Sequence, residues 1–234
     1  VIFLESKDNA KIKHLRGLIE LNSARKKHQQ TVLEGTHLCL TWLQQQKKIF
    51  SLFTTEQALA HPDLQKIIEL HKGHIFVISE VLYKDLSTLG TTLPCLAIID
   101  LPSNIQTIDF SKDTLILENV QDPGNVGTLL RSAAAANVKQ VICTQGSALL
   151  WSPRVLRAGM GAHFSLHCFE NYQLTDILPK FNIPVFVTSS HRSTSLYGKD
   201  LTQPCVWILG NEGQGASDYA LEDAQAVTIH QPGG

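Results

Sequence analysis

The stretch ENVQDPGNVGTLLRSAAAANV, residues 118–138, joins an apolar segment to an alanine-rich one through a turn of Gly, Pro and Asn. The apolar segment ends at Val120, and the pattern after it predicts a strand, a tight turn and a helix. Asn125, Gly127 and Arg131 stand near the start of this predicted helix. A structural interpretation makes Asn125 the N-cap, Gly127 a packing residue and Arg131 a surface cation. The functional alternative is that these polar groups hold a ligand at the junction.

Near-continuous apolar segments recur along the second half of the chain. From residue 114 onward they are TLILENV, QVICTQ, PVFVTSS and CVWILG, each separated from the next by enough residues for a helix. This alternation predicts a parallel sheet covered on both faces. Ligands of such sheets lie beyond the carboxyl ends of the strands, so the candidate ligand loops follow Val120, Val187, Leu209 and Ile229.

A second glycine-rich turn follows one of these strands, in VWILGNEGQGAS at residues 206–217. Its glycines either permit a tight turn or let a ligand approach the backbone. Glu212 lies among them, and a carboxylate at the end of a buried strand is unfavourable unless it is paired or functional. We expect Arg131 to be its partner. Neither turn has the spacing of a GxxxxGK[ST] phosphate loop or a GxGxxG dinucleotide loop.

Residues 1–100 form a separate alternation of helical and strand patterns. The predicted order is a basic helix near 8–20, strand TVLEG, helix THLCLTWLQQQ, strand IFSLFTT, helix PDLQKIIELHK, strand HIFVIS, a short helix and strand CLAIID. The segment LPSNIQTIDFSKD, residues 101–113, lacks periodicity and is the predicted linker. We therefore expect two domains, at 1–102 and 113–234.

Positive charge is concentrated near the amino terminus. Residues 1–50 carry nine Lys or Arg and four acidic residues, a balance of +5, although the whole chain has a formal charge of −1. Such a segment either contacts the phosphates of a nucleic acid or forms a solvated helix face, and both interpretations stay open on charge alone.

Composition argues against several classes of protein. A chain of 234 residues, 43% of them hydrophobic, can bury a proper core. It has no apolar run long enough to span a bilayer and no signal peptide, so we expect a cytoplasmic protein without a membrane partner. The five widely spaced cysteines indicate reduced core residues. His163 and His167 lie in AHFSLHCF, which reads as a strand, so we expect structural histidines and no metal site.

The two turns together resemble the SpoU (TrmH-like) family of the SPOUT RNA methyltransferases. ENVQDPGNVGTLLRSAAAANV resembles that family's first motif and WILGNEGQGAS its second. Between them, SPRVLRAGMGAHFSLHC resembles the family's Arg-Ala-(Ser/Gly)-Met-Gly-Ala segment. This resemblance covers about residues 112–234. Residues 1–100, through TVLEGTHLCLTWL, resemble more loosely a ribosomal-protein-like RNA-binding domain that many members carry.

The third motif of the family is matched only at its start. Ile229 and Pro232 correspond to that start, whereas the Ser-Leu-Asn-Val helix that follows in the family has no counterpart before Gly234. We therefore expect the sequence to be a fragment that lacks the end of its methyltransferase domain.

For the fold, the resemblance implies a carboxyl-terminal SPOUT-type parallel sheet with a trefoil knot, preceded by a smaller α/β RNA-binding domain. It implies S-adenosylmethionine as the cofactor, RNA as the partner and a homodimer as the assembly. The residues implied in cofactor binding are Thr188, Gly210, Asn211, Gly213, Ile229 and Pro232.

The resemblance also implies catalytic roles for Arg131, Asn125 and Glu212. The reaction would be methyl transfer to a ribose 2'-hydroxyl, a weak nucleophile whose proton must be removed or whose developing charge must be stabilised. Because an arginine is normally always charged, holding a phosphate or the alkoxide is a more conservative role for Arg131 than acting as a base. Asn125 would position the ribose or Arg131, and Glu212 would orient the arginine and shape the cofactor loop.

The leading hypothesis is thus an S-adenosylmethionine-dependent 2'-O-ribose methyltransferase of ribosomal RNA, with transfer RNA as the near alternative. A rival from another class is a non-catalytic RNA-binding protein on the same scaffold, which the missing part of the third motif favours and the Asn125, Arg131 and Glu212 constellation opposes. A small-molecule α/β enzyme is a third possibility, and the basic amino-terminal segment argues mildly against it.

Overall fold

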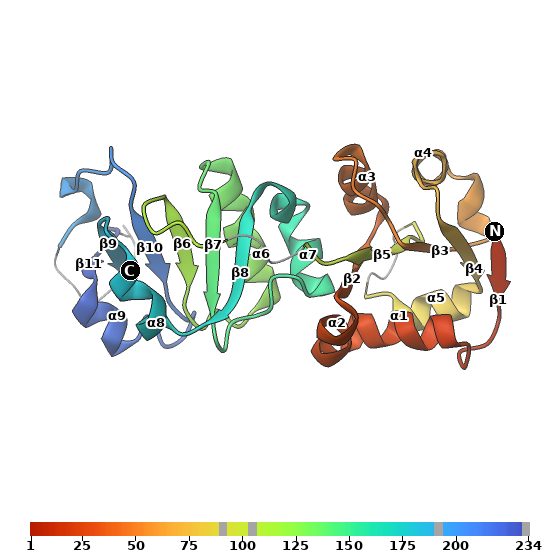
Figure 1. Ribbon diagram of the computed structural model, residues 1–234, viewed down its shortest axis with the longest axis horizontal. Helices are drawn as coiled ribbons and strands as arrows, with labels where there is room; N and C mark the ends of the chain where they lie inside the picture. Colours follow the sequence, from red (N-terminus) through yellow and green to blue (C-terminus); the bar gives the residue numbers. More distant parts are fainter. Residues whose placement is uncertain (89–92, 103–106, 190–193, 231–234) are drawn as a thin grey trace. The chain divides into compact units, whose positions relative to one another are not determined.

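The computed structural model describes residues 1–88, 93–102, 107–189 and 194–230, and the chain divides into two compact units. The first unit comprises Val1–Ser103 and Trp151–Gly161, and the second comprises Asn104–Leu150 and Ala162–Gly234. Each has its own sheet (Figure 1) and its own hydrophobic core. Within the described ranges, no helix is long and apolar enough to cross a membrane.

A five-stranded mixed sheet forms the centre of the first unit, in the order β1-β4-β3-β5-β2. The strands β1, β4 and β3 are parallel, while β5 is antiparallel to both of its neighbours, β3 and β2. It follows that β2 and β3 run in the same direction. The strand bounds are Ile2–Leu4 (β1), Gln30–Glu34 (β2), Ser51–Thr55 (β3), His74–Ile78 (β4) and Leu96–Asp100 (β5).

Helices cover both faces of this sheet, with α1 and α5 on one side and α3 and α4 on the other (Figure 1). Side-chain caps start several of them: Asn9 accepts from the backbone of Lys11 at α1, and Ser79 accepts from Leu82 at α5. The helix bounds are Ala10–Glu20 (α1), Asn22–His28 (α2), Thr36–Gln44 (α3), Pro62–Leu70 (α4) and Glu80–Leu86 (α5), with a 3-10 turn at Gln57–Ala60 (η1).

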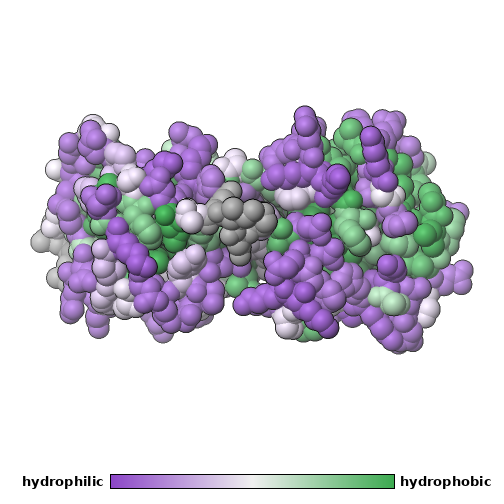
Figure 2. Space-filling model, in the orientation of Figure 1, coloured by the Kyte–Doolittle hydropathy of each residue, from purple (hydrophilic) through white to green (hydrophobic). Residues whose placement is uncertain are grey.

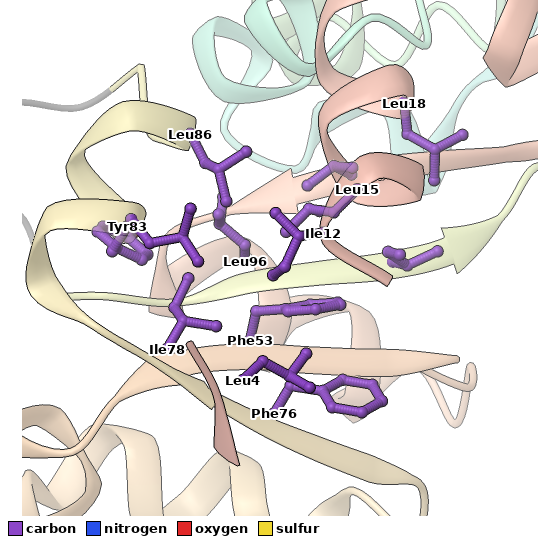
Figure 3. Close-up of a cluster of buried hydrophobic side chains, with 13 residues drawn as sticks. Leu4, Ile12, Leu15, Leu18, Phe53, Phe76, Ile78, Tyr83, Leu86 and Leu96 are labelled. Carbon is purple, nitrogen blue, oxygen red and sulfur yellow. The ribbon is translucent and has the colours of Figure 1, made fainter. Parts of the chain in front are cut away.

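The core of the first unit lies between the sheet and the pair α1 and α5 (Figure 3). Ile12, Leu15 and Leu18 project from one face of α1 and are fully buried. They pack with the side chains of Phe53 and Phe76, whose stacked rings lie 4.9 Å apart on neighbouring strands. The spacing of three residues between Ile12, Leu15 and Leu18 places them on one face of α1, and this face packs onto the sheet.

One helix from the middle of the sequence also belongs to the first unit. Pro153–Gly159 (α7) packs against β2, and the hydroxyl of Thr31 donates to the carbonyl of Trp151 at 2.7 Å just before it. Arg157 donates to the hydroxyl of Thr88 at 2.6 Å. The sequence predicts a domain at 113–234 that includes this segment, whereas the structure places the segment in the first unit.

The second unit contains a six-stranded sheet in the order β11-β9-β10-β6-β7-β8, in which every paired strand is parallel. The predicted parallel sheet is confirmed, and β6 lies where the strand order reverses between β10 and β7. The strand bounds are Thr114–Leu117 (β6), Gln140–Thr144 (β7), His167–Tyr172 (β8), Val185–Thr188 (β9), Val206–Leu209 (β10) and Gln225–Val227 (β11).

Short helices connect these strands. Leu174 and Ile177 of α8 and Ala220 of α9 pack in one core cluster with Ile116 and Ile208 of the sheet. The helix bounds are Pro123–Ala135 (α6), Leu174–Ile177 (α8) and Asp218–Asp223 (α9), and the 3-10 turns are Ala162–Ser165 (η2), Leu178–Lys180 (η3) and Leu196–Gly198 (η4).

Three local predictions differ from the structure. The strand β1 and the helix α2 were not predicted, because β1 has only three residues and NSARKKH of α2 has no apolar periodicity. The segment AHFSLHCF is a 3-10 turn before it becomes β8, so His163 lies in a turn and only His167 begins the strand.

Figure 2 shows hydrophobic surface at the end of the first unit that carries β1, where Phe3 is 61% exposed.

Most of the cysteines and His163 have buried side chains. All five cysteines are free thiols; four are buried and Cys168 is half-buried, as predicted for reduced core residues. The His163 side chain is buried and donates from Nε2 to the carbonyl of Leu150 at 2.8 Å. Burial lowers the pKa of His163 to about 4, so this histidine is neutral at physiological pH.

Candidate active site

The carboxyl ends of β6 and β10 lie side by side in the second unit, because these strands pair in register through Leu117 and Leu209. The turn after β6 leads into α6, and the turn after β10 spans residues 210–217. The strand order reverses at β6, so this edge is the topological switch point where open parallel sheets hold their ligands. Both sequence motifs therefore meet where a substrate or cofactor is expected.

The β10 turn is closed on itself by Asn211. Its backbone exchanges two hydrogen bonds with Gly215, each 2.9 Å long, and its Oδ1 accepts from the backbone of Gly213 and Gln214. Its Nδ2 donates across to the carbonyl of Asn119, also at 2.9 Å. The side chain of Asn211, predicted to bind cofactor, thus holds the shape of its own turn and fastens it to the β6 turn.

Glu118 makes a second connection between the two turns, and it is not among the site residues predicted from the sequence. Its buried carboxylate accepts from the backbone N–H of Ser217 at 2.9 Å and from the hydroxyl of Ser217 at 2.5 Å. A charged residue directly after the apolar run TLIL was the available signal, since a buried carboxylate needs such donors.

Asn125 and Glu212 form the third connection. The Asn125 amide donates to Glu212 Oε1 at 2.9 Å, and both side chains are exposed. That hydrogen bond, with smaller contributions from backbone N–H groups of residues 212, 122 and 121, holds the pKa of the Glu212 carboxyl below its usual value. Glu212 is therefore an ionised acceptor over the physiological pH range.

Two details of the predicted site are corrected by these contacts. Glu212 pairs with Asn125 and, among the described residues, makes no ion pair with Arg131. The N-cap of α6 is Asp122, whose carboxylate accepts from the backbone of Asn125 at 2.8 Å. Since the cap position is filled by Asp122, the Asn125 side chain is available to Glu212.

Arg131 lies about two helical turns into α6 and is exposed. In the described part of the chain its guanidinium makes no ion pair and no hydrogen bond that would hold it in place. An exposed cation of this kind can donate up to five hydrogen bonds to a phosphate or an alkoxide.

A third loop supports the β6 turn from the other side. The hydroxyl of Thr144, at the end of β7, accepts from the backbone of Asn119 at 3.0 Å, and the hydroxyl of Ser147 accepts from Val120 at 3.1 Å. Asn119 has a left-handed backbone with φ +54°, which asparagine tolerates better than most residues. The turn carrying the candidate catalytic residues is thus held by hydrogen bonds from both neighbouring strands.

The glycines of the β10 turn serve its backbone shape. A Cβ on Gly210 would lie 2.3 Å from the backbone nitrogen of Ala216, whereas one on Gly213 would meet nothing closer than 3.6 Å. Close approach at Gly210 therefore comes from the turn's own backbone. Gly213 keeps an open face toward solvent.

Two other predicted cofactor residues, Thr188 and Ile229, lie at the ends of neighbouring strands. Thr188 ends β9, and Ile229 follows β11, which pairs with β9. The Ile229 side chain is 46% exposed, so it can offer apolar surface to a ligand at this edge. Pro232 lies outside the described residues, as do Ser190, His191 and Arg192 of the loop after β9.

The residues present suit a cofactor with a polar and an apolar part. Backbone at the ends of β9 and β10 offers hydrogen-bonding groups, and Ile229 offers an apolar surface. Within the described ranges no group of three or more His, Cys, Asp or Glu side chains is positioned to hold a metal ion.

Comparison with known proteins identifies the family of the chain. The model of the SpoU rRNA Methylase family matches residues 112–234, and that of the MRM3-like substrate binding domain matches residues 9–97. The chain belongs to the SpoU rRNA methylase family. It is an RNA methyltransferase by this membership, and the turns after β6 and β10 both lie within the matched region.

Individual relatives cover nearly the whole chain. An uncharacterized tRNA/rRNA methyltransferase of Synechocystis is 32% identical over 97% of this chain and 83% of its own length. The mitochondrial rRNA methyltransferase 3B of Danio rerio is 34% identical over 82% of this chain, but this chain spans only 45% of that relative. A crystal structure of an RNA 2'-O ribose methyltransferase superposes with a TM-score of 0.84 at 26% identity, covering 100% of this chain and 91% of that one.

Proposed function

We propose that this SpoU-family protein transfers a methyl group from S-adenosylmethionine to a ribose 2'-hydroxyl of ribosomal RNA. The observation that carries the proposal is the Asn125 to Glu212 hydrogen bond, which joins the two family motifs at the switch point of the sheet. The family description supports ribosomal RNA, and the 2'-O-ribose position is supported by the structural relative at 26% identity.

Arg131 is the group proposed to meet the reacting hydroxyl. A ribose hydroxyl is a poor nucleophile, and negative charge develops on its oxygen as its proton is lost to solvent, before the oxygen attacks the methyl group and the S–CH3 bond breaks. A guanidinium that is exposed and unpaired within the described residues can donate to that oxygen or to the adjacent phosphate. Arg131 would thus act as an electrostatic clamp, since a guanidinium carries only donors and has no lone pair available to accept a proton.

Asn125 and Glu212 are proposed to position the ribose beside Arg131. The ionised carboxylate of Glu212 holds the amide of Asn125 in one orientation, which leaves the amide oxygen of Asn125 directed away from its partner. That oxygen can accept a hydrogen bond from a ribose hydroxyl. Fixed orientation of this kind lowers the entropic cost of bringing the reactants together.

The proposed cofactor residues are Thr188, Gly210, Asn211, Gly213, Ile229 and Pro232. S-adenosylmethionine supplies a methyl group on a sulfonium, which a weak oxygen nucleophile can attack. Backbone at Thr188 and Gly210 would hydrogen-bond its polar parts, and the exposed side chain of Ile229 would cover its adenine. Asn211 would act indirectly, by maintaining the turn that presents Gly210.

The test is a methyl-transfer assay with the full chain, labelled S-adenosylmethionine and three RNA pools: large-subunit rRNA, small-subunit rRNA and tRNA. We expect label in rRNA, recovered after alkaline hydrolysis in dinucleotides, because 2'-O-methylation protects the adjoining linkage from alkali. Label in mononucleotides would place the methyl group on a base and overturn the ribose assignment. Label in tRNA alone would overturn the assignment of rRNA as the substrate. Binding of RNA without any methyl transfer would favour the non-catalytic alternative.

The trefoil knot, the homodimer, the RNA-binding role of residues 1–102 and the cytoplasmic location stay predictions. Light scattering of the purified chain measures the assembly directly, and a mass equal to one chain would contradict the homodimer.

A further inference from the structure

The first unit does not present all of its positive charge to a ligand. Lys13 pairs with Asp8 at 2.9 Å, and Arg16 pairs with Asp85 and with Glu20. Arg25 is buried and donates to the carbonyl groups of Leu18 and Ile19. These three cations stabilise the fold around α1, so the basic character of residues 1–50 must be located on the remaining ones.

Three of the remaining cations, together with Lys72, lie at one end of the first sheet. Because β2, β3 and β4 run in the same direction, the segments before them meet at the amino-terminal end of these strands. Lys26 and Lys27 precede β2, Lys48 precedes β3, and Lys72 precedes β4. All four are exposed, and within the described residues none makes an ion pair.

An exposed aromatic residue lies at the same end of the sheet. Phe50, directly before β3, is 52% exposed, although its backbone is fixed by a hydrogen bond to Ile98 at 2.8 Å. The neighbouring loop is close, because a Cβ on Gly73 would lie 3.2 Å from the Phe50 carbonyl. Phe50 and Lys72 therefore belong to one continuous surface.

The backbone that carries this ring is also held from within. The indole of Trp42 donates to the carbonyl of Lys48 at 2.9 Å, and the ammonium of Lys47 lies over the Trp42 ring at 4.5 Å. A fixed backbone with an exposed ring suits stacking of a planar ligand better than packing of a core residue. Acidic groups are fewer here: Glu20, Glu69 and Asp100 share this end, Glu20 pairs with Arg16, and Asp100 already accepts from Gln30.

The opposite end of the same sheet has the reverse character. Glu5, Glu56 and Glu80 line a pocket of about 250 Å³ at the carboxyl ends of β1, β3 and β4. Lys7 and Lys11 lie at this end too, but the pocket itself is acidic and would repel phosphates. Ligands of parallel sheets usually lie at the carboxyl ends of the strands. In this unit the charge distribution instead favours the amino ends of the strands as the place where RNA binds.

We propose that the amino-end surface of the first unit, made of Lys26, Lys27, Lys48, Phe50 and Lys72, binds unpaired nucleotides of the RNA substrate. The lysines neutralise phosphates, and Phe50 stacks on a base. From β4 to β2 the strands span about 14 Å, which suits a few nucleotides of a single-stranded loop. The proposal rests on the proposed function, because it assigns where that function's RNA is held.

Charge reversal at the two ends of the sheet tests this surface. The variant is Lys48→Glu with Lys72→Glu, and the matched control is Lys7→Glu with Lys11→Glu, which makes the same change in charge at the other end. Binding of the full chain to a labelled single-stranded RNA of about 12 nucleotides is measured by fluorescence anisotropy over a range of salt concentrations. We expect the variant to bind at least about tenfold more weakly and to lose about 1.4 from the slope of log K against log salt, while the control changes less than about threefold.

Phe50 gives an independent readout that charge does not affect. Phe50→Ala is expected to weaken binding by roughly 5- to 100-fold with an unchanged salt slope, and Phe50→Tyr should retain it, because stacking needs only the ring. Circular dichroism of each variant confirms that the fold is kept.

The outcomes separate this surface from the proposed function. Equal weakening by the Lys48/Lys72 pair and the Lys7/Lys11 pair would overturn the surface, as would a Phe50→Ala protein that binds like the wild type. In both cases rRNA methylation by the wild-type chain would leave the proposed function intact. A wild-type chain that binds the RNA with these effects but methylates none would contradict the function and support the surface.

Discussion

The substitution Gly210→Ala tests whether the β10 turn depends on its own close packing. A Cβ there would lie 2.3 Å from both the Ala216 nitrogen and the Gly215 carbonyl carbon, more than 1 Å inside ordinary contact of about 3.5 Å. These neighbours are backbone, so the turn itself must move. Movement of that size breaks the two Asn211 to Gly215 hydrogen bonds and strains the bond from Asn211 to Asn119.

Each of these hydrogen bonds contributes about 1 kcal/mol, so Gly210→Ala should lower the free energy of unfolding of the second unit by about 2–3 kcal/mol. The melting temperature should fall by about 4–12 °C. Because Glu212 lies in the same turn, methyl transfer should be lost even at temperatures where the protein is folded. Differential scanning calorimetry and the methyl-transfer assay measure the two effects separately.

Gly213→Ala is the matched control, because its Cβ would meet nothing nearer than 3.6 Å. It should change the free energy of unfolding by less than about 0.5 kcal/mol. If Gly210→Ala melts within about 1 °C of Gly213→Ala, the turn is not held by the close approach inferred here.

Three further predictions concern single side chains. Arg131→Ala should lower kcat for methyl transfer by at least about 100-fold with unchanged S-adenosylmethionine affinity by calorimetry, and near-normal turnover would remove Arg131 from the mechanism. Glu118→Gln keeps the size of the side chain but weakens its two bonds to Ser217, so urea denaturation should show a loss of about 1–3 kcal/mol, whereas an unchanged midpoint would mean that the carboxylate charge is unimportant. Burial lowers the pKa of His163 from 6.5 to about 4, so the unfolded chain takes up a proton at a higher pH than the folded chain does. The free energy of unfolding should therefore be greatest above about pH 6.5 and should decrease by up to about 3 kcal/mol toward pH 4. The urea midpoint of His163→Gln should depend less on pH over that range than the midpoint of the wild type.

The elements of the second unit were largely predictable, because its strands are continuous apolar runs. Such runs are buried on both faces of a parallel sheet, and few other structures accommodate them. The short edge strand β1 and the polar helix α2 escaped prediction, since neither has the periodicity that burial imposes. Tertiary packing, and not local sequence preference, holds them.

The site was predictable at the level of its two motifs but not of its contacts. The turns of residues 118–125 and 210–217 were selected from the sequence, and the structure brings them together at adjacent strand ends. Which polar group meets which depends on side-chain directions that spacing does not reveal. Glu212 meets Asn125 and not Arg131, and Asp122, not Asn125, caps the helix α6.

By itself, the sequence determined the α/β class, the parallel sheet, the family motifs and an excess of positive charge near the amino terminus. Only the tertiary structure decided where that charge is free, because ion pairs with Asp8 and Asp85 and the burial of Arg25 join residues that no local pattern links. The physical reason is the distance along the chain over which each kind of interaction acts. The periodicity of buried residues and the backbone preferences of turn residues depend on neighbours in the chain. Hydrogen bonds and ion pairs between distant residues depend on which strand ends the fold brings side by side.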